Sequence, residues 1–408
     1  MSDSASLGEA QAAPAPGATR AADKHLRLGI LGGGQLGRML ALAAIPLGVQ
    51  CRFLVTPEPD ARQMLGDYFN QTDPAAELAF SAGLSAATAE FEAVDVQLLT
   101  RLEQATPVRP SATALMHKRD RRAERTLLAK LNLPQPHWAG TAGDRAHTAN
   151  NPEEVQKLLL EAVRNVGMPC RVKSAFGGYD GHGQWAIRSP SDLKQIDARA
   201  GPFVVEAEVP FDVEFSLLGA FAARTDVATT HAEAPAKQAR FWTPTINQHV
   251  RGILLRSDTV RDELSQHLRQ DAERMMRTLA DALDYCGVLA IEFFCVGQQL
   301  LINEFAPRVH NTGHWTIDGA HTSQFANHVR AVLGLPLGAT TQRCACISWN
   351  VLGQWPDKSS LLRIPGLHVH DYDKTPRPGR KLGHVTLSDT SPDDPRIAQV
   401  ERLLVTAL

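Results

Sequence analysis

The stretch LRLGILGGGQLGRMLALAAIPLGVQCRFLV, residues 26–55, predicts a strand, a glycine turn, a helix that ends at Gly48, and a second strand. This order makes a βαβ unit, which is typical of a Rossmann-like α/β domain. We therefore expect the folded part of the chain to begin with such a domain.

Later patterns divide the chain further. The α/β pattern ends near residues 107–111, and VRPSATALMHKRDRRAERTLLAKLNLP (108–134) predicts one charged helix that stops near Leu133 and Pro134. A second region begins near Arg119, and short strands fill the last 60 or so residues. We expect a disordered tail at 1–25, an α/β domain at 26–118, a central α+β domain at 119–330 and a β-rich domain at 331–408.

Composition narrows the class of protein. The 408 residues carry a net charge of −2, which gives no support for non-specific nucleic-acid binding. Six cysteines in so long a chain do not indicate a disulfide framework. No apolar run approaches the roughly 18 residues of a membrane span, and residues 1–25 lack the apolar core of a signal peptide. We expect a cytoplasmic protein that binds neither nucleic acid nor membrane.

The glycine turn admits several interpretations. Gly32, Gly34 and Gly37 fit G-x-G-x-x-G between a strand and a helix. A dinucleotide site also needs an acidic residue after the second strand, where this chain has Thr56 and Pro57. Binding of a phosphate or ribose group at the helix N-terminus and simple tight-turn packing both stay open, and a nicotinamide cofactor is less favoured.

The central region mixes helical and extended patterns. A helix is predicted around 153–164, and the apolar spacing within 261–286 predicts a second helix about 24 residues long. Residues 227–240 are rich in alanine and mixed charge and predict a surface loop. Strands are predicted in MPCRVKS (168–174), GQWAIRS (183–189), PFVVEAEV (202–209) and EFSLLGAFA (214–222).

A lysine precedes a glycine-rich loop in this region. Lys173 ends a strand, and GGYDGHGQ follows from Gly177 to Gln184. Glycines let successive backbone N–H groups wrap phosphate oxygens, and a nearby lysine supplies a point charge. No P-loop signature is present, so a glycine-rich hairpin with a solvated lysine stays an equal alternative.

Two carboxylates stand inside apolar strands. Glu292 lies in VLAIEFFCV (288–296) and Glu304 in QLLINEFA (299–306), with a turn at Gly297. Charges rarely occupy such strands without a partner. A two-residue turn would send these side chains to opposite faces, whereas an odd-length loop would pair them. Paired carboxylates repel unless a cation intervenes, so the hairpin and the loop together predict metal-assisted phosphoryl transfer.

Four separated motifs carry a resemblance to a known family. NEFAPRVHNTGHWT (303–316), GGYDGHGQ, RPGRKLGH and GILGGGQLGRML, together with EFE (90–92), resemble the 5-(carboxyamino)imidazole ribonucleotide synthase family of ATP-grasp enzymes in purine biosynthesis. The resemblance covers roughly residues 26 to 390. It implies a pre-ATP-grasp domain, an ATP-grasp module of two lobes and a small C-terminal β-rich domain.

The resemblance also implies a reaction. The family carboxylates aminoimidazole ribonucleotide with bicarbonate while ATP is cleaved, and carboxyphosphate is the expected intermediate. Phosphorylation gives bicarbonate a leaving group, and closure of the site protects the labile species from water. ATP and Mg²⁺ (or Mn²⁺) are implied as cofactors, and a homodimer is the implied assembly.

Site residues follow from the same resemblance. The ATP site would comprise Arg121, Lys173, Gly178, Tyr179, Asp180, Gly181, His182, Gly183, Gln184, Glu206, Ala207, Glu208, Val209, Glu214, His249, Asn303 and Glu304. Catalytic roles would fall to Tyr179, Asp180, Arg308, His310 and Lys374, and substrate binding to Gln35, Glu90, Arg380 and Lys381. The divalent cation would be held by Glu292 and Glu304.

The chain departs from the family pattern near the phosphates. His182, Ala175, Phe176 and Phe221 stand where the family tends to carry basic residues. Because His182 is cationic only when protonated, we expect reduced or pH-dependent ATP turnover. Arg171, Arg224 or Arg240 could compensate from other positions. Identical pH profiles at about pH 6 and pH 8 for the chain and for His182→Arg would contradict this expectation.

Other functions stay open on the sequence alone. A related ATP-grasp ligase could act on another small acid or ribonucleotide, and a catalytically weakened homologue could only bind nucleotide. Retention of Lys173, Glu292, Glu304 and Arg308 argues against the second alternative. A dehydrogenase is disfavoured because the glycine turn lacks its acidic companion.

Overall fold

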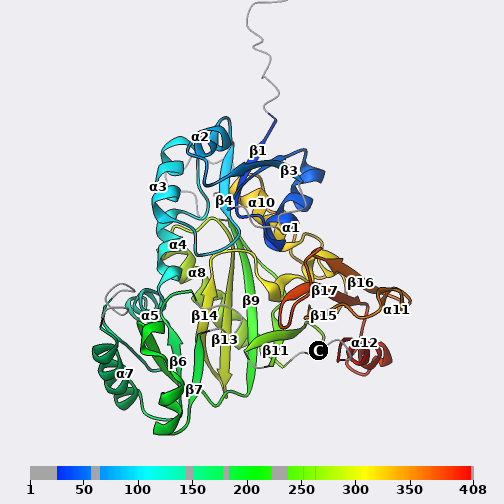
Figure 1. Cartoon of the computed structure of the whole chain (residues 1–408). Helices are drawn as coiled ribbons and strands as arrows, with labels where there is room; N and C mark the ends of the chain where they lie inside the picture. Colours follow the sequence, from blue (N-terminus) through cyan, green and yellow to red (C-terminus); the bar gives the residue numbers. More distant parts are fainter. Residues whose placement is uncertain are drawn as a thin grey trace, which may run out of the picture.

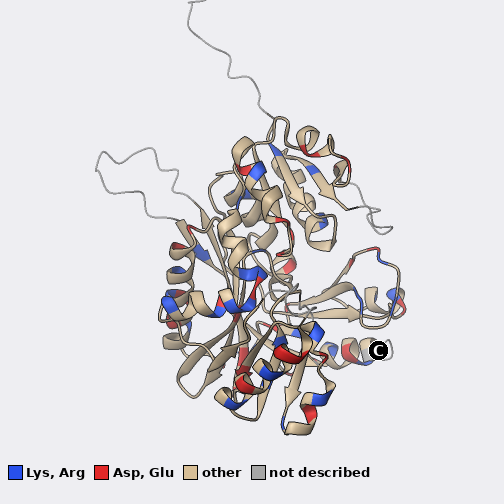
Figure 2. Cartoon of the chain, turned by 60° about the vertical axis from the view of Figure 1, so that its left-hand side comes forward, with Lys and Arg blue, Asp and Glu red and all other residues tan. Residues whose placement is uncertain are grey.

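The structure is a computed structural model that describes residues 25–56, 65–143, 151–177, 183–222, 238–250, 252–261 and 263–405. Three sheets form its framework, and each belongs to a different part of the molecule (Figure 1). None of the described helices combines the length and apolar character needed to cross a bilayer. Lys and Arg and Asp and Glu occur in every part of the molecule (Figure 2).

The N-terminal domain is a four-stranded parallel sheet in the order β3-β2-β1-β4. The predicted βαβ unit is confirmed, and Gly48 ends the helical segment with a left-handed φ of 68°. The elements are β1 (Arg27–Leu31), α1 (Gln35–Ala44), η1 (Ile45–Leu47), β2 (Gln50–Val55), β3 (Gly66–Asn70), α2 (Ala76–Ser81), β4 (Ala86–Ala89) and α3 (Val96–Ala105).

The single charged helix predicted over residues 108–134 is wrong. Two helices occupy this stretch, α4 (Ala112–Arg119) and α5 (Arg121–Lys130). Asp120 separates them with an extended backbone, and its side chain accepts from the N–H of Arg122. An aspartate in this geometry is an N-cap, so it starts a new helix instead of continuing the old one.

A small lobe follows. Its antiparallel sheet has the order β5-β8-β6-β7, and α7 packs against it over an apolar core that includes Val155, Leu159 and Phe203. The predicted helix and strands of this part are confirmed. The elements are β5 (Trp138–Gly140), α7 (Pro152–Val166), β6 (Cys170–Ser174), β7 (Gln184–Ile187), η2 (Pro190–Gln195), η3 (Ala198–Ala200) and β8 (Phe203–Ala207).

The largest sheet has nine described strands in the order β14-β13-β9-β11-β12-β15-β17-β16, with β10 paired to β9. Residues 238–240 belong to β10, so the predicted loop over 227–240 is wrong there, and 227–237 lie outside the described residues. The strands are β9 (Val213–Ala222), β10 (Gln238–Phe241), β11 (Thr245–Val250), β12 (Ile253–Asp258), β13 (Gly287–Val296), β14 (Gln299–Ala306), β15 (Cys346–Leu352), β16 (Leu367–Asp371) and β17 (Lys381–Ser388).

The helices beside this sheet include the long one expected near residue 270. It is 17 residues long, shorter than predicted, because the Ser265 side chain caps it by accepting from Leu268 N–H. The apolar residues at positions 264 and 283 lie just outside it and still pack in the same core. The elements are α8 (Gln266–Ala282), η4 (Asn311–Gly313), α9 (Thr316–Gly319), α10 (Gln324–Val332), α11 (Lys358–Leu362) and α12 (Pro395–Val405).

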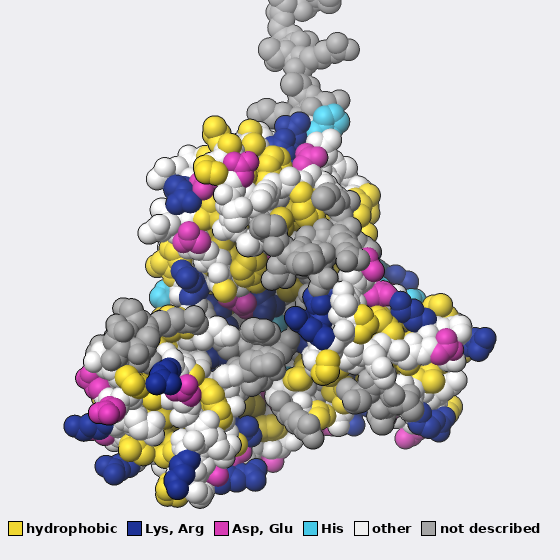
Figure 3. Space-filling model, viewed as in Figure 1, with side chains coloured by type: hydrophobic (Ala, Val, Ile, Leu, Met, Phe, Trp, Pro, Cys, Tyr) yellow, Lys and Arg dark blue, Asp and Glu magenta, His cyan; other side chains and the backbone are white. Residues whose placement is uncertain are grey.

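The domains are joined by shared cores and shared strands. One apolar cluster runs from β1 and α1 through α10 to β9 and β13, so the N-terminal domain and the large sheet pack as one body. At the other side, β12 pairs with β15, so the C-terminal strands continue the large sheet. The three lobes surround a hollow whose walls carry basic and acidic side chains (Figure 3).

Candidate active site

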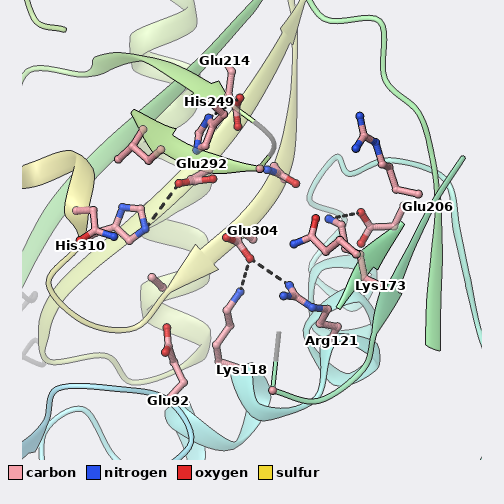
Figure 4. A pocket seen from close by; sticks show the side chains of 18 of the residues that line it. Glu92, Lys118, Arg121, Lys173, Glu206, Glu214, His249, Glu292, Glu304 and His310 are labelled. Atoms are coloured by element: carbon pink, nitrogen blue, oxygen red, sulfur yellow. Dashed lines mark hydrogen bonds and ion pairs between the residues drawn. The ribbon is translucent and has the colours of Figure 1, made fainter. Parts of the chain in front are cut away.

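The hollow is a cavity of about 1340 Å³ where the three lobes meet. Its walls come from the loop after β4, the end of α4, strands β6, β8, β13 and β14, and the start of β17. Most described residues that the sequence analysis singled out lie on it. Figure 4 shows the carboxylates and cations of its centre pointing toward one another.

Glu292 and Glu304 meet, but not through the predicted turn. The turn has two residues, since Val296 pairs with Gln299. A β-bulge then intervenes: Phe293 pairs with Ile302 and Glu292 pairs with Glu304, which leaves Asn303 as an extra residue. The requirement for an odd-length loop was therefore wrong, because one inserted residue within the strand has the same effect on facing as one in the turn.

Glu304 is held by two cations. Its Oε2 lies 3.1 Å from Lys118 Nζ and 3.2 Å from an Arg121 nitrogen (Figure 4). Burial would raise the pKa of Glu304, but the charges of Lys118, Arg121 and Lys173 hold it well below its ordinary value. Glu304 is therefore ionised across the physiological range.

The pKa of Glu292 is shifted in the opposite direction. Burial and the charge of Glu304 raise the pKa of Glu292 to about 7. Its Oε1 lies 3.7 Å from His310 Nε2, and one donor atom each of Glu214, His249 and Glu292 lie within 4.8 Å of one another. His249 in turn contacts Glu214 at 3.0 Å, and this contact raises the pKa of His249 against the opposing effect of burial. These residues offer oxygen and nitrogen ligands to a cation.

Lys173 and Glu206 form a buried pair. Lys173 Nζ lies 2.7 Å from Glu206 Oε2, and Arg125 lies 2.7 Å from Oε1. Burial would raise the pKa of Glu206, but Arg125 and Lys173 lower it to about 2. Arg125 also donates to the carbonyls of Ile302 and Asn303, so this pair joins the small lobe to β14.

The last residues of β8 and those that follow it line the cavity. Residues 206–209 follow one another along the wall, and Phe211 stacks on Phe294 at a centroid distance of 4.7 Å. Arg171 also lines the cavity and contacts Glu208 at 3.1 Å. Three arginines were candidates to replace the basic residues that this chain lacks near the phosphates. Of these, Arg171 is on the cavity wall, Arg240 lies on β10, and Arg224 is outside the described residues.

The glycine turn is filled by Glu90. Its two carboxylate oxygens accept from the N–H groups of Gly34 and Gly37, each at 2.5 Å. A Cβ atom at Gly32, Gly34 or Gly37 would come within 2.9 Å of the Glu90 side chain. The three glycines therefore make room for this carboxylate, which occupies the N-terminus of α1. Glu90 takes the N–H groups that a phosphate or ribose group at this helix end would use, so these contacts favour tight-turn packing.

Arg308 and His310 continue from β14 into the cavity. Arg308 Nε lies 2.8 Å from Glu92 Oε1, which links the central domain to the loop after β4. The backbone N–H of His310 donates to Gln324 Oε1 at 2.8 Å, and the side-chain amide of Gln324 donates to the His310 carbonyl at 2.7 Å. Burial and the charge of Arg308 hold the pKa of His310 well below its ordinary value, so this imidazole is neutral.

The three basic residues of the C-terminal domain that were predicted to act on substrate differ in whether they line the cavity. Lys381 is buried and lines the cavity. Lys374 donates to Gln35 Oε1 at 2.5 Å, which joins two residues predicted to handle substrate. Arg380 donates to the carbonyl of Thr375 and is not among the described residues of the cavity wall.

Part of the predicted site lies outside the described residues, namely Gly178, Tyr179, Asp180, Gly181 and His182. Three of the departures from the family pattern are placed, and one of them, Ala175, is buried at the cavity wall. Phe176 lies on the cavity wall with the Arg122 guanidinium 5.5 Å from its ring centre. Phe221 is buried against Phe241 and Tyr285, so this position faces the core and not the phosphates.

Sequence reasoning missed several residues of the site. Lys118 was hidden in a run of charged residues that predicted a solvated helix. Glu92 belongs to the quoted EFE motif but received no role, and Gln324 lies in an ordinary helical pattern. The partners of these residues lie on other elements, so no local sequence pattern indicates them.

Comparison with known families covers nearly the whole folded chain. Residues 26–118 match the ribonucleotide synthetase preATP-grasp domain, 145–325 the ATP-grasp domain, and 346–396 the phosphoribosylaminoimidazole carboxylase C-terminal domain. The ATP-grasp architecture expected from the sequence is thus confirmed.

Individual relatives agree. The chain is 39% identical over 389 residues to N5-carboxyaminoimidazole ribonucleotide synthase of Pseudomonas aeruginosa, covering 93% of this chain and 99% of that protein. The synthetase from Thermus thermophilus matches with a TM-score of 0.79 and 40% identity over 92% of this chain and 98% of that one. The Aspergillus clavatus synthase, solved with ADP and 5-aminoimidazole ribonucleotide, matches with a TM-score of 0.77 and 25% identity over 93% and 99%. The chain therefore belongs to the N5-carboxyaminoimidazole ribonucleotide synthase family of ATP-grasp ligases.

Proposed function

We propose that this protein carboxylates 5-aminoimidazole ribonucleotide with bicarbonate in an ATP-dependent reaction of de novo purine biosynthesis. The observation that carries the proposal is that one strand and its continuation bring both the expected metal ligand and the expected substrate-binding residues to the same cavity. β14 carries Glu304, and its continuation carries Arg308 and His310 into the same cavity that Lys173 and Gln35 line. The solved complex of a relative with ADP and 5-aminoimidazole ribonucleotide supports the same pair of ligands.

The nucleotide would lie between the small lobe and the large sheet. Residues 206–209 offer backbone groups to the base, and Glu214 would take the ribose hydroxyls. Lys173 and Arg121 are cations on the wall that would contact the phosphates. His249, held at 3.0 Å by Glu214, would complete this side.

A magnesium or manganese ion would be held by Glu292 and Glu304. The residues fit such an ion, because two facing carboxylates, one with a pKa raised to about 7, repel each other until a cation relieves them. When bound, the ion supplies neutralisation of the phosphate charge during phosphoryl transfer.

The chemistry would proceed in two steps. The terminal phosphoryl group of ATP passes to a bicarbonate oxygen, which gives ADP and carboxyphosphate. The amine of the ribonucleotide then attacks the carboxyl carbon, the bond from that carbon to the phosphate oxygen breaks, and the inorganic phosphate that leaves takes up the proton that the amine loses. Arg308 and Lys381 would hold the anionic groups, and neutral His310, whose Nδ1 accepts from Thr312 N–H, can donate a hydrogen bond from Nε2.

Other groups would act around this centre. Lys374 would act beside Gln35, whereas Glu90 would shape the wall through its contacts with the glycine turn. Tyr179 and Asp180 stay predictions for the catalytic loop, and Arg380 stays a prediction for substrate binding.

The assembly and location belong to the same proposal. We expect a cytoplasmic protein and, as the resemblance implies, a homodimer. Light scattering on the eluting chain should give twice the mass of 44.4 kDa, and a monomer at micromolar concentration would contradict it.

Release of ADP tests the activity directly. It should require both 5-aminoimidazole ribonucleotide and bicarbonate, varied independently, and Glu292→Gln should lower the rate at least about 100-fold. Glu161→Gln, an exposed acid on α7, is the matched control and should leave the rate unchanged. ADP release that neither substrate stimulates would overturn the assignment.

A further inference from the structure

Lys118 is a buried cation with no role in the sequence analysis. Its ammonium lies 3.1 Å from Glu304 Oε2 and 3.0 Å from Glu124 Oε2, and its side chain is only 10% exposed. It lines the cavity and points at Glu304 from the end of α4 (Figure 4). A lysine in this environment is held by its charge partners, since an unpaired ammonium would be costly to bury.

Glu124 fixes the ammonium in this place. This carboxylate is almost fully buried, accepts from Lys118 with both oxygens, and also accepts from the backbone N–H of Phe305 at 3.0 Å. The lysine nitrogen also lies 5.6 Å from the centre of the Phe305 ring. Lys118 is therefore tied to β14 at Glu304 and, through Glu124 and the aromatic ring, at Phe305.

The Lys118 ammonium lies beside the carboxylate of Glu304, where a divalent ion bound to Glu304 would also place positive charge. Two positive groups, Lys118 and Arg121, already contact one oxygen of that carboxylate. A divalent ion on Glu304 alone would meet their repulsion in a partly desolvated site. Phosphates that arrive with the ion would reverse this balance, because they attract both the ion and the lysine.

We propose that Lys118 is the counter-ion of Glu304 in the nucleotide-free enzyme and passes from that carboxylate to the phosphates when metal and nucleotide bind together. The proposal rests on the proposed function only in taking Glu304 as a metal ligand. Lys118 then makes metal binding depend on nucleotide. Bare metal binds weakly, and the metal–nucleotide complex binds well.

The test measures metal binding, with no turnover. Mn²⁺ is titrated against the full chain, with and without ADP, and free Mn²⁺ is read by electron paramagnetic resonance. The double variant Lys118→Met with Glu124→Gln removes both members of the pair, so net charge is kept and no buried carboxylate is left without a partner. A glutamine at 124 can still accept from Phe305 N–H.

We expect the double variant to bind Mn²⁺ alone about tenfold more tightly than the natural chain, and ADP to improve its Mn²⁺ affinity by a correspondingly smaller factor. Lys130→Met, an exposed lysine on α5, is the control and should change neither value. Unchanged Mn²⁺ affinity in the folded double variant would overturn the proposal.

A second double variant keeps the test decisive if methionine at position 118 prevents folding. Lys118→Gln with Glu124→Gln retains hydrogen bonding to Glu304 without a charge and carries the same expectation. The outcome is also separable from the proposed function. A chain without ADP release that still shows the tightening keeps the role of Lys118 and loses the synthase activity.

Discussion

Several side chains of the cavity form buried ion pairs. For one of them, Glu206, the contribution to the free energy of unfolding can be measured. Burial would raise its pKa, but Arg125 and Lys173 lower it from an ordinary 4.5 to about 2. A carboxylate whose pKa is lower in the folded state stabilises the fold above its unfolded pKa. This stabilisation is therefore complete above about pH 4.5 and is lost as the pH falls toward 2.

Glu206→Gln should remove this stabilisation at neutral pH. Glutamine keeps the shape but leaves Arg125 and Lys173 buried without a counter-charge, so the free energy of unfolding should fall by about 3 kcal/mol at pH 7. Urea unfolding at pH 7 and near pH 4 measures it, and the gap to the natural chain should narrow at the lower pH. Glu208→Gln, which breaks a more exposed pair with Arg171, should cost less than about 1 kcal/mol. An equal loss in the two variants would contradict the argument.

Residues of the site were predictable where their type was anomalous among its neighbours. Glu292 and Glu304 were such residues, because acids inside apolar strands demand a partner. Glu90 was named, yet its partners at Gly34 and Gly37 lie on another element, so its role as the cap of α1 was not foreseeable. Lys118 had no anomaly to reveal it.

Among secondary elements, the type was predictable and the exact ends were not. Apolar periodicity gave α7, α8 and the hairpin strands, since it reports which face is buried. Breaks and starts came from side-chain caps at Asp120 and Ser265, which apolar periodicity does not report. The hairpin register likewise depended on a bulge that no periodic pattern predicts.

The bulge at Asn303 predicts how the hairpin responds to changes in length. One glycine inserted between Gly297 and Gln298 should leave ADP release within about threefold of the natural rate. Phe293, Ile302 and Phe305 are fully buried, so a slip in register would expose Phe305 to the cavity, and the turn will absorb the extra residue instead.

Deletion of Asn303 is the matched change inside the strand. The pairing on both sides of the deletion would be kept, so Glu304 would still face Glu292, but loss of the bulge would remove the local bend and twist of the strand that leads toward Arg308 and His310. Arg308 and His310 would then be misplaced, and the rate should fall at least about 100-fold. The interpretation fails if the insertion abolishes activity or if the deletion leaves it intact.

At the scale of the whole molecule, the cavity depends on how the domains dock. Sequence patterns predicted three folded parts but not their orientation, because docking rests on contacts between residues far apart in the chain. His328 on α10 makes one such contact. Its Nδ1 accepts from Val288 N–H at 3.0 Å, so Nε2 carries the hydrogen and donates to Thr88 Oγ1 at 2.8 Å in the N-terminal domain.

This histidine should make domain docking sensitive to acid. Burial lowers the pKa of His328 from 6.5 to about 4, so the folded state holds it neutral while the unfolded state takes up a proton below pH 6.5. The natural chain should therefore lose up to about 3 kcal/mol as the pH falls from about 6.5 to 4. His328→Gln should be less stable at pH 7 by about 1–3 kcal/mol but should lack this part of the pH dependence. Urea unfolding at pH 7, 6 and 5 measures both slopes, with the exposed His137→Gln as control, and parallel curves for the natural chain and His328→Gln would show that docking does not depend on this proton.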